Sequence, residues 1–164
     1  GGGHAALLEW LRQNGCAWDE LTCVAAARAG RLETLRWAYE HGAPWSAQLV
    51  CCNAATHGRL SVLVWVRERG CPFDATYVCY NAATGGHTDV LAWARAAQCP
   101  WDEHVCLAAA EEGHLPTLQY AVANGCPWDH RTVEHAKTNA IRDWAIANGC
   151  PSQPPHEPIR CTVF

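Results

Sequence analysis

The chain has 164 residues, 49% of them apolar, which is enough to bury a sizeable core. A net charge of −4 and the lack of any basic block argue against a nucleic-acid-binding protein. No apolar run reaches the roughly 18 residues of a membrane-spanning helix, and no signal peptide is visible. Because the sequence has no methionine and opens in mid-repeat, we expect a fragment of a longer chain with a truncated first repeat.

An aromatic-led motif recurs at a nearly constant interval. Successive units are 27 or 28 residues long, and a shortened unit closes the series. The leading residues are Trp10, Trp37, Trp65, Trp93, Tyr120 and Trp144. A fixed period of this length is typical of a solenoid, in which each repeat packs only against its neighbours. We therefore expect an extended surface rather than a catalytic pocket.

The leading aromatic residue lies in the first helix predicted for each unit. In the third unit Leu60, Leu63 and Val66 are spaced along one stripe of such a helix. A glycine such as Gly70 then ends the helix in the left-handed conformation, and a proline follows in most units. Gln98 replaces that glycine in the fourth unit, so we expect a strained or differently shaped turn there.

A second helix follows in each unit, and an N-cap residue marks its start. The caps are Asp19, Ser46, Asp74, Asp102 and Asp129. The aromatic residue before each cap and an apolar residue four positions after it form a hydrophobic staple. A pair of alanines within this helix permits close approach of a neighbouring helix.

The predicted helices alternate along the chain. The first helices lie near residues 5–14, 32–41, 60–69, 88–97, 115–124 and 140–148. The second, expected to be shorter, lie near residues 20–29, 47–57, 75–84, 103–112 and 130–138. No segment is predicted to be a strand, so the fold class is all-α: stacked helix-turn-helix repeats over residues 1–150, about five with a partial sixth. The proline-rich residues 151–164 are predicted to be a disordered tail.

Residues 82–91, AATGGHTDVL, and residues 109–118, AAEEGHLPTL, resemble the ankyrin repeat, as does the Gly-Ala or Gly-Cys after the first helix. These units are shorter than the about 33 residues usual in that family. The missing residues lie where the family carries its hairpin finger. The resemblance is to the short, Trp- and Cys-rich ankyrin-like repeats of protists and large DNA viruses. It implies an ankyrin-like solenoid with reduced or absent fingers.

The resemblance also implies a non-enzymatic scaffold that binds a protein partner through its inner helices, which are the second helices here. The candidate contacts are the variable positions Glu20, Leu21, Ala47, Gln48, Ala75, Thr76, Glu103, His104, His130 and Arg131. Tip positions Arg28, His57, Glu111 and Glu112 are further candidates. An unselected solvated face would vary in the same way. Alternatively, the array is the substrate-targeting arm of a larger protein. In either case we expect an intracellular monomer.

The eleven cysteines could form a thiol-based metal or redox sensor. However, no Cys-x-x-Cys pair is present, and Ala43 occupies the place of Cys71. Equivalent cysteines are expected one repeat apart, too far for a disulfide. We interpret them as packing residues, with no metal site and no cofactor. Cys52 and Cys161 are the candidates for exposure.

The histidines and tryptophans have structural interpretations too. His4, His87 and His114 share one position before the first helix, where a contact to the backbone explains them better than catalysis. The tryptophans could form a stacking platform for bases or sugars, but we interpret them as core residues. No nucleophile-base pair, phosphate-binding loop or other catalytic motif is present.

Overall fold

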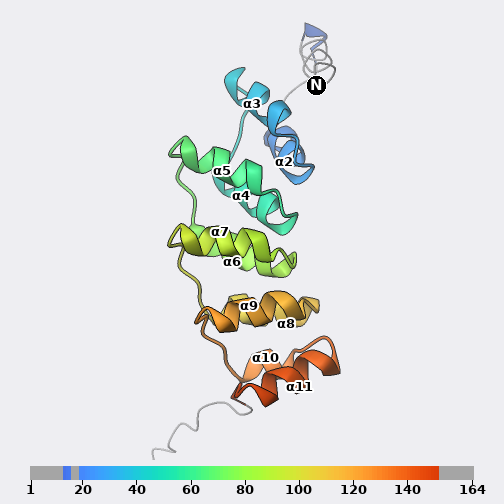
Figure 1. Cartoon of the computed structure of the whole chain (residues 1–164). Helices are drawn as coiled ribbons and strands as arrows, with labels where there is room; N and C mark the ends of the chain where they lie inside the picture. The colour runs from blue at the N-terminus through green and yellow to red at the C-terminus, as the bar shows by residue number, and fades with distance from the viewer. Residues whose placement is uncertain (1–12, 16–18, 152–164) are drawn as a thin grey trace, which may run out of the picture.

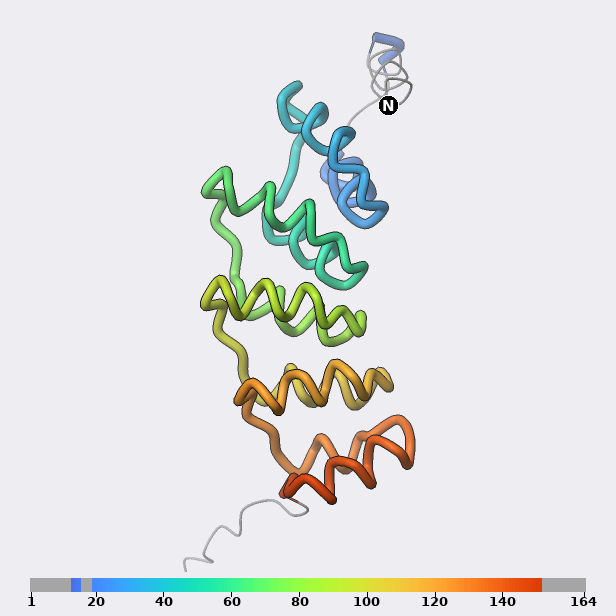
Figure 2. Tube along the Cα trace, viewed as in Figure 1, coloured from blue at the N-terminus to red at the C-terminus, as the bar shows by residue number. Residues whose placement is uncertain are grey.

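The computed structural model describes residues 13–15 and 19–151 (Figure 1). This part of the chain is all-helical, with ten complete α-helices and no strand. The helices form antiparallel pairs, and the pairs are stacked in a row (Figures 1 and 2). Each pair consists of an inner helix, which is the second helix of one sequence unit, and the outer helix that follows it, which is the first helix of the next unit. The inner helices are α2 (Glu20–Arg28), α4 (Ala47–Thr56), α6 (Ala75–Thr84), α8 (Glu103–Glu112) and α10 (His130–Glu134). The outer helices are α3 (Leu32–Glu40), α5 (Leu60–Glu68), α7 (Thr88–Ala96), α9 (Leu115–Ala123) and α11 (Asn139–Ala147).

The helix boundaries agree with those predicted to within one residue, except at α10. That helix ends at Glu134 rather than at residue 138. Thr138 instead caps α11, and its side chain accepts a hydrogen bond from the backbone of Ile141. The backbone of Lys137 meanwhile donates to Ala110 of the preceding inner helix, so the chain has already left the α10 axis. The expectation that the inner helices are shorter is wrong for α2, α4, α6 and α8, which are at least as long as the outer helices, and holds only for α10, with 5 residues. Most of the helix near 5–14 and of the tail lies outside the described residues.

The predicted caps of all five inner helices are confirmed. Each Asp or Ser side chain accepts a backbone hydrogen bond from the first turn of its helix, at 2.9 to 3.3 Å. Gln98 is confirmed as an irregular turn residue, since its φ is 58° and every other described residue with positive φ is glycine. A side chain in this conformation is strained.

The outer helices α5, α7 and α9 begin differently, because their N-cap side chains reach back to the preceding pair. His87 Nε2 donates to the carbonyl of Thr56 at 3.1 Å, and His114 Nε2 donates to that of Thr84 at 3.1 Å. Arg59 makes the same contact to Arg28 O. Each acceptor is the last residue of an inner helix, where carbonyl groups lack helical partners. The predicted backbone contact of His87 and His114 is therefore confirmed; His4 lies outside the described residues.

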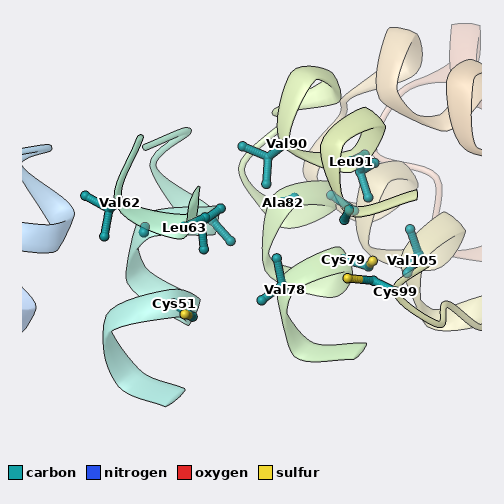
Figure 3. Packing of buried hydrophobic residues seen from close by; sticks show 14 of the residues in the cluster. Cys51, Val62, Leu63, Val78, Cys79, Ala82, Val90, Leu91, Cys99 and Val105 are labelled. Carbon is teal, nitrogen blue, oxygen red and sulfur yellow. The ribbon is translucent and has the colours of Figure 1, made fainter. Parts of the chain in front are cut away.

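The core runs along the stack between inner and outer helices. Leu63 and Leu91 of the outer helices and Val78 and Ala82 of an inner helix are fully buried (Figure 3). The alanine pairs of α4, α6 and α8 have no exposed surface, and neighbouring inner helices pack closely there. Seven described tryptophans were predicted to be core residues. Six of them pack against this core, whereas Trp37 stacks on His41 at 4.1 Å.

None of the described helices is long and apolar enough to cross a membrane.

Candidate functional site

The structure divides the ten predicted contact residues into two groups. Glu20, Leu21, Thr76, Glu103, His104 and His130 expose all or part of their side chains along the first turns of the inner helices. Leu21 is the one apolar residue in this group, and it is 67% exposed. Ala47 and Ala75 instead pack against the hydrophobic core. Gln48 and Arg131 are engaged in contacts within the chain.

Gln48 joins two neighbouring repeats. Its Oε1 accepts a hydrogen bond from the backbone N–H of Asp74 at 2.7 Å, and its Nε2 donates to Cys52 Sγ at 3.3 Å. The side chain therefore connects α4 to the residue that caps α6. We assign Gln48 a structural role, because a partner that used its amide would have to break these bonds.

Arg131 joins α10 to α8 in a similar way. Its guanidinium lies 2.7 Å from Asp129 Oδ2 and 3.4 Å from Glu103 Oε1. The hydrogen bonds from Arg131 hold the pKa of Asp129 below its usual value. The positive charge of Arg131 is thus neutralised by its own neighbours.

The tip candidates also pair with other side chains of the chain. Arg28 Nε donates to His57 Nε2 at 3.1 Å across two repeats. Glu111 lies 3.6 Å from His135, and Glu112 lies 3.5 Å from Lys137. These pairs link the C-terminal ends of successive inner helices, so the side chains there serve mainly to hold neighbouring repeats together.

An apolar stripe crosses the N-terminal halves of three inner helices, and sequence reasoning found only one of its residues. The stripe consists of Leu21 on α2, Leu49 on α4 and Tyr77 on α6, which are 67%, 43% and 56% exposed. Each of them lies five residues before the alanine pair of its helix. Since α2, α4 and α6 pack side by side, equivalent positions on them are neighbours (Figure 1).

Leu49 and Tyr77 were missed because the predicted contacts were counted from the caps. The cap lies eight residues before the alanine pair in α4 and α6 but seven residues before it in α2. One residue turns the helix by about 100°, so the same distance from the cap selects a different face. Counting from the alanine pair would have found the stripe.

A groove lies next to the stripe, between α6 and α8. It encloses about 430 Å³ and is lined by Asp74, Thr76, Tyr77, Tyr80, Asp102 and His104. Tyr80 is 40% exposed, so both tyrosine rings are open to solvent. Thr76 and His104 belong to the predicted contacts, whereas Tyr80 was not among them.

The cysteines are mostly buried, as predicted. All nine in the described residues are free thiols, and those on the inner helices, Cys23, Cys51, Cys79 and Cys106, have no exposed surface. Burial raises the pKa of Cys51 and of Cys79 to about 12. Cys52, a candidate for exposure, is half-buried, and so is Cys71. Cys161 lies outside the described residues.

Some cysteines come closer together than the spacing of equivalent positions suggested. Cys79 on α6 lies beside Cys99 in the turn after α7 (Figure 3). Cys106 on α8 lies beside Cys126 in the turn after α9, and the interaction between the two thiols together with burial raises the pKa of Cys106. Each pair joins a cysteine on an inner helix to a cysteine in the turn after an outer helix. The sequence argument compared only cysteines at the same position of successive repeats. In residues 13–15 and 19–151, no three His, Cys, Asp or Glu side chains converge to hold a metal ion.

The chain matches no model of a known protein family, and no curated protein is significantly similar to it. The case for a function therefore depends on the residues and geometry of this chain.

Proposed function

We propose that this chain is an ankyrin-like solenoid that acts as a non-enzymatic scaffold and binds a partner protein through its inner helices. The observation that carries the proposal is the apolar stripe of Leu21, Leu49 and Tyr77, which runs into the α6–α8 groove. Single exposed apolar residues are common on protein surfaces, whereas three of them at equivalent positions on neighbouring helices are a clustering typical of interaction sites.

The division of roles within each repeat supports this proposal. Burial of residues such as Leu63 and Leu91 and the contacts of His87 and His114 stabilise the stack. The stripe contributes to none of these, so its apolar character has no structural explanation in the described part of the chain. The 27- or 28-residue period and the resemblance of the motif further support an ankyrin-like array.

The thiols favour an intracellular binding module over a thiol-based sensor. Free cysteines are typical of reducing compartments. A reactive or metal-binding cysteine needs an accessible thiolate, whereas burial raises the pKa of Cys51 and Cys79.

The proposal can be tested by affinity capture with three baits, followed by mass spectrometry. The first bait is the wild-type chain, and the second carries Leu21→Ser, Leu49→Ser and Tyr77→Ser. The third carries Ile146→Ser, which removes an apolar side chain that is 52% exposed on α11, away from the stripe. Circular dichroism would first establish that all three baits are equally helical.

We expect at least one protein to bind the wild-type and Ile146→Ser baits and to be lost from the stripe variant. The three serine substitutions remove apolar contact area without opening a cavity, because the side chains are exposed. Equal capture by all three baits, or no specific capture, would refute binding through the stripe.

A further inference from the structure

The α6–α8 groove combines aromatic walls with acidic groups from two repeats. Tyr77 and Tyr80 lie on α6, one helical turn apart, and both rings are exposed. Asp74 and Asp102 are the caps of α6 and α8. Because α6 and α8 are neighbouring inner helices, these four side chains line one groove of about 430 Å³.

Carboxylate oxygens and tyrosine hydroxyl groups in the groove remain available to form hydrogen bonds with a ligand. Asp74 and Asp102 each use Oδ1 to cap their helices, at 2.9 and 3.1 Å, and Asp102 Oδ1 also lies 3.4 Å from His104 Nδ1. A carboxylate has two oxygens and about four acceptor positions, so each group can accept further bonds. The hydroxyl groups of Tyr77 and Tyr80 have no hydrogen-bond partner among the residues that the structure describes.

The charge around the groove favours a cationic ligand. The caps and first turns of α6 and α8 carry three carboxylates, Asp74, Asp102 and Glu103, and no arginine or lysine. Arg131 of the neighbouring helix α10 pairs with Glu103 and with Asp129, which neutralise its charge. A positively charged side chain would therefore be attracted to the groove, whereas an anion would be repelled.

We infer that the α6–α8 groove binds an arginine side chain of the partner protein, presented by an extended segment whose apolar residues lie along the stripe. This inference rests on the proposed function and names the chemistry of the partner. The guanidinium has five donors in one plane, which suits acceptors on two sides of a groove. Its flat face also stacks on aromatic rings. Lysine offers only a compact ammonium group and would use the tyrosine rings less well.

The experiment is selection of short random peptides displayed on phage, with the wild-type chain as the immobilised target. A variant with Asp74→Asn and Asp102→Asn removes both charges, and its helices stay capped because asparagine caps about as well as aspartate. The matched control is Asp89→Asn, which removes an exposed carboxylate on α7 outside the groove. A further variant with Tyr77→Leu and Tyr80→Leu removes the rings but keeps apolar side chains.

We expect peptides selected by the wild-type chain and by Asp89→Asn to be enriched in one arginine flanked by apolar residues. Fluorescence polarisation with the most enriched peptide should show that the Asp74→Asn and Asp102→Asn variant binds it roughly tenfold more weakly or worse, as is typical when charge-assisted hydrogen bonds are lost. The tyrosine variant should lose the preference for arginine over lysine. Affinity should also fall as salt is added.

The possible failures are distinguishable. Enriched peptides without arginine, or an arginine preference that survives in the Asp74→Asn and Asp102→Asn variant, would overturn this inference and leave the proposed function standing. Lysine enriched as strongly as arginine would overturn the assignment of a planar cation. If no peptide is enriched and no protein is captured through the stripe, both proposals fail.

Discussion

Replacement of Gly86 by alanine tests the contact that joins successive repeats. Gly86 lies between α6 and α7 with a φ of 73°, a conformation that disfavours any side chain. The imidazole of His114 lies over this glycine, and a Cβ atom at Gly86 would come within 2.6 Å of His114 Nδ1. The ring must then move, and its 3.1 Å hydrogen bond to Thr84 O is lost.

The expected cost is the sum of two effects. Alanine in the left-handed conformation costs about 1 kcal/mol relative to glycine. Loss of the His114 hydrogen bond leaves the partly buried carbonyl of Thr84 unpaired, which costs about 1–3 kcal/mol. Gly86→Ala should therefore destabilise the chain by about 2–4 kcal/mol.

Gly42→Ala is the matched control. Gly42 has a φ of 75°, and a Cβ atom there would meet nothing within 4 Å. Both substitutions restrict the unfolded chain equally, so the difference between them isolates the clash with the ring. We expect that difference, from urea unfolding followed by circular dichroism at constant pH, to be about 1–3 kcal/mol.

A double-mutant cycle provides a second check. Without the ring, in His114→Ala, the added Gly86→Ala substitution should cost about as much as Gly42→Ala does. Equal costs of Gly86→Ala and Gly42→Ala in the otherwise wild-type chain would refute packing of His114 on Gly86.

Three further outcomes test the core, a turn and the thiols. Trp65→Ala should lower the free energy of unfolding by about 3–5 kcal/mol, because Trp65 is only 4% exposed. Trp93 is half-buried, so Trp93→Ala should lower it by less. A loss below about 1 kcal/mol for Trp65→Ala would contradict core packing. Gln98→Gly should raise the unfolding free energy by up to about 1 kcal/mol by relieving the left-handed strain at φ 58°, and a decrease would contradict that strain. The unfolding free energy should also fall as the pH rises from the ordinary thiol pKa towards about 12, since thiols of the unfolded chain ionise before Cys51 and Cys79 do. Cys51→Ala with Cys79→Ala should make this loss shallower, and an unchanged slope would refute the burial effect.

The elements of the fold were predictable because their signals are local. A cap such as Asp102 acts on an N–H two or three residues away, and the residue after a helix sets its end within one turn. The failure at α10 has a long-range cause, because the backbone of Lys137 bonds to Ala110 in the preceding repeat. Nothing within the segment itself reveals such a bond.

The candidate site was predictable in region but not in detail. Variation between repeats drew attention to the first turns of the inner helices, but it cannot tell an exposed position from one used within the stack. Gln48 varies between repeats and yet holds the backbone of Asp74, and Arg131 varies and yet pairs with Glu103. Identifying these roles requires the relative positions of neighbouring helices, which depend on packing along the whole array.

The two ends of each inner helix therefore carry different constraints. At the C-terminal end, a glycine such as Gly86 and a reaching side chain such as His114 must match each other, so neither can change alone. At the N-terminal end, the residue five positions before the alanine pair differs between repeats: it is leucine in α2 and α4, tyrosine in α6 and histidine in α8, and all four are exposed. Since each repeat of a solenoid packs only against its neighbours, these positions can change one at a time without altering the stack. Under the proposed function, an array built in this way could change its partner by substitutions on the stripe, while the core and the contacts at the C-terminal ends of the inner helices continue to stabilise it.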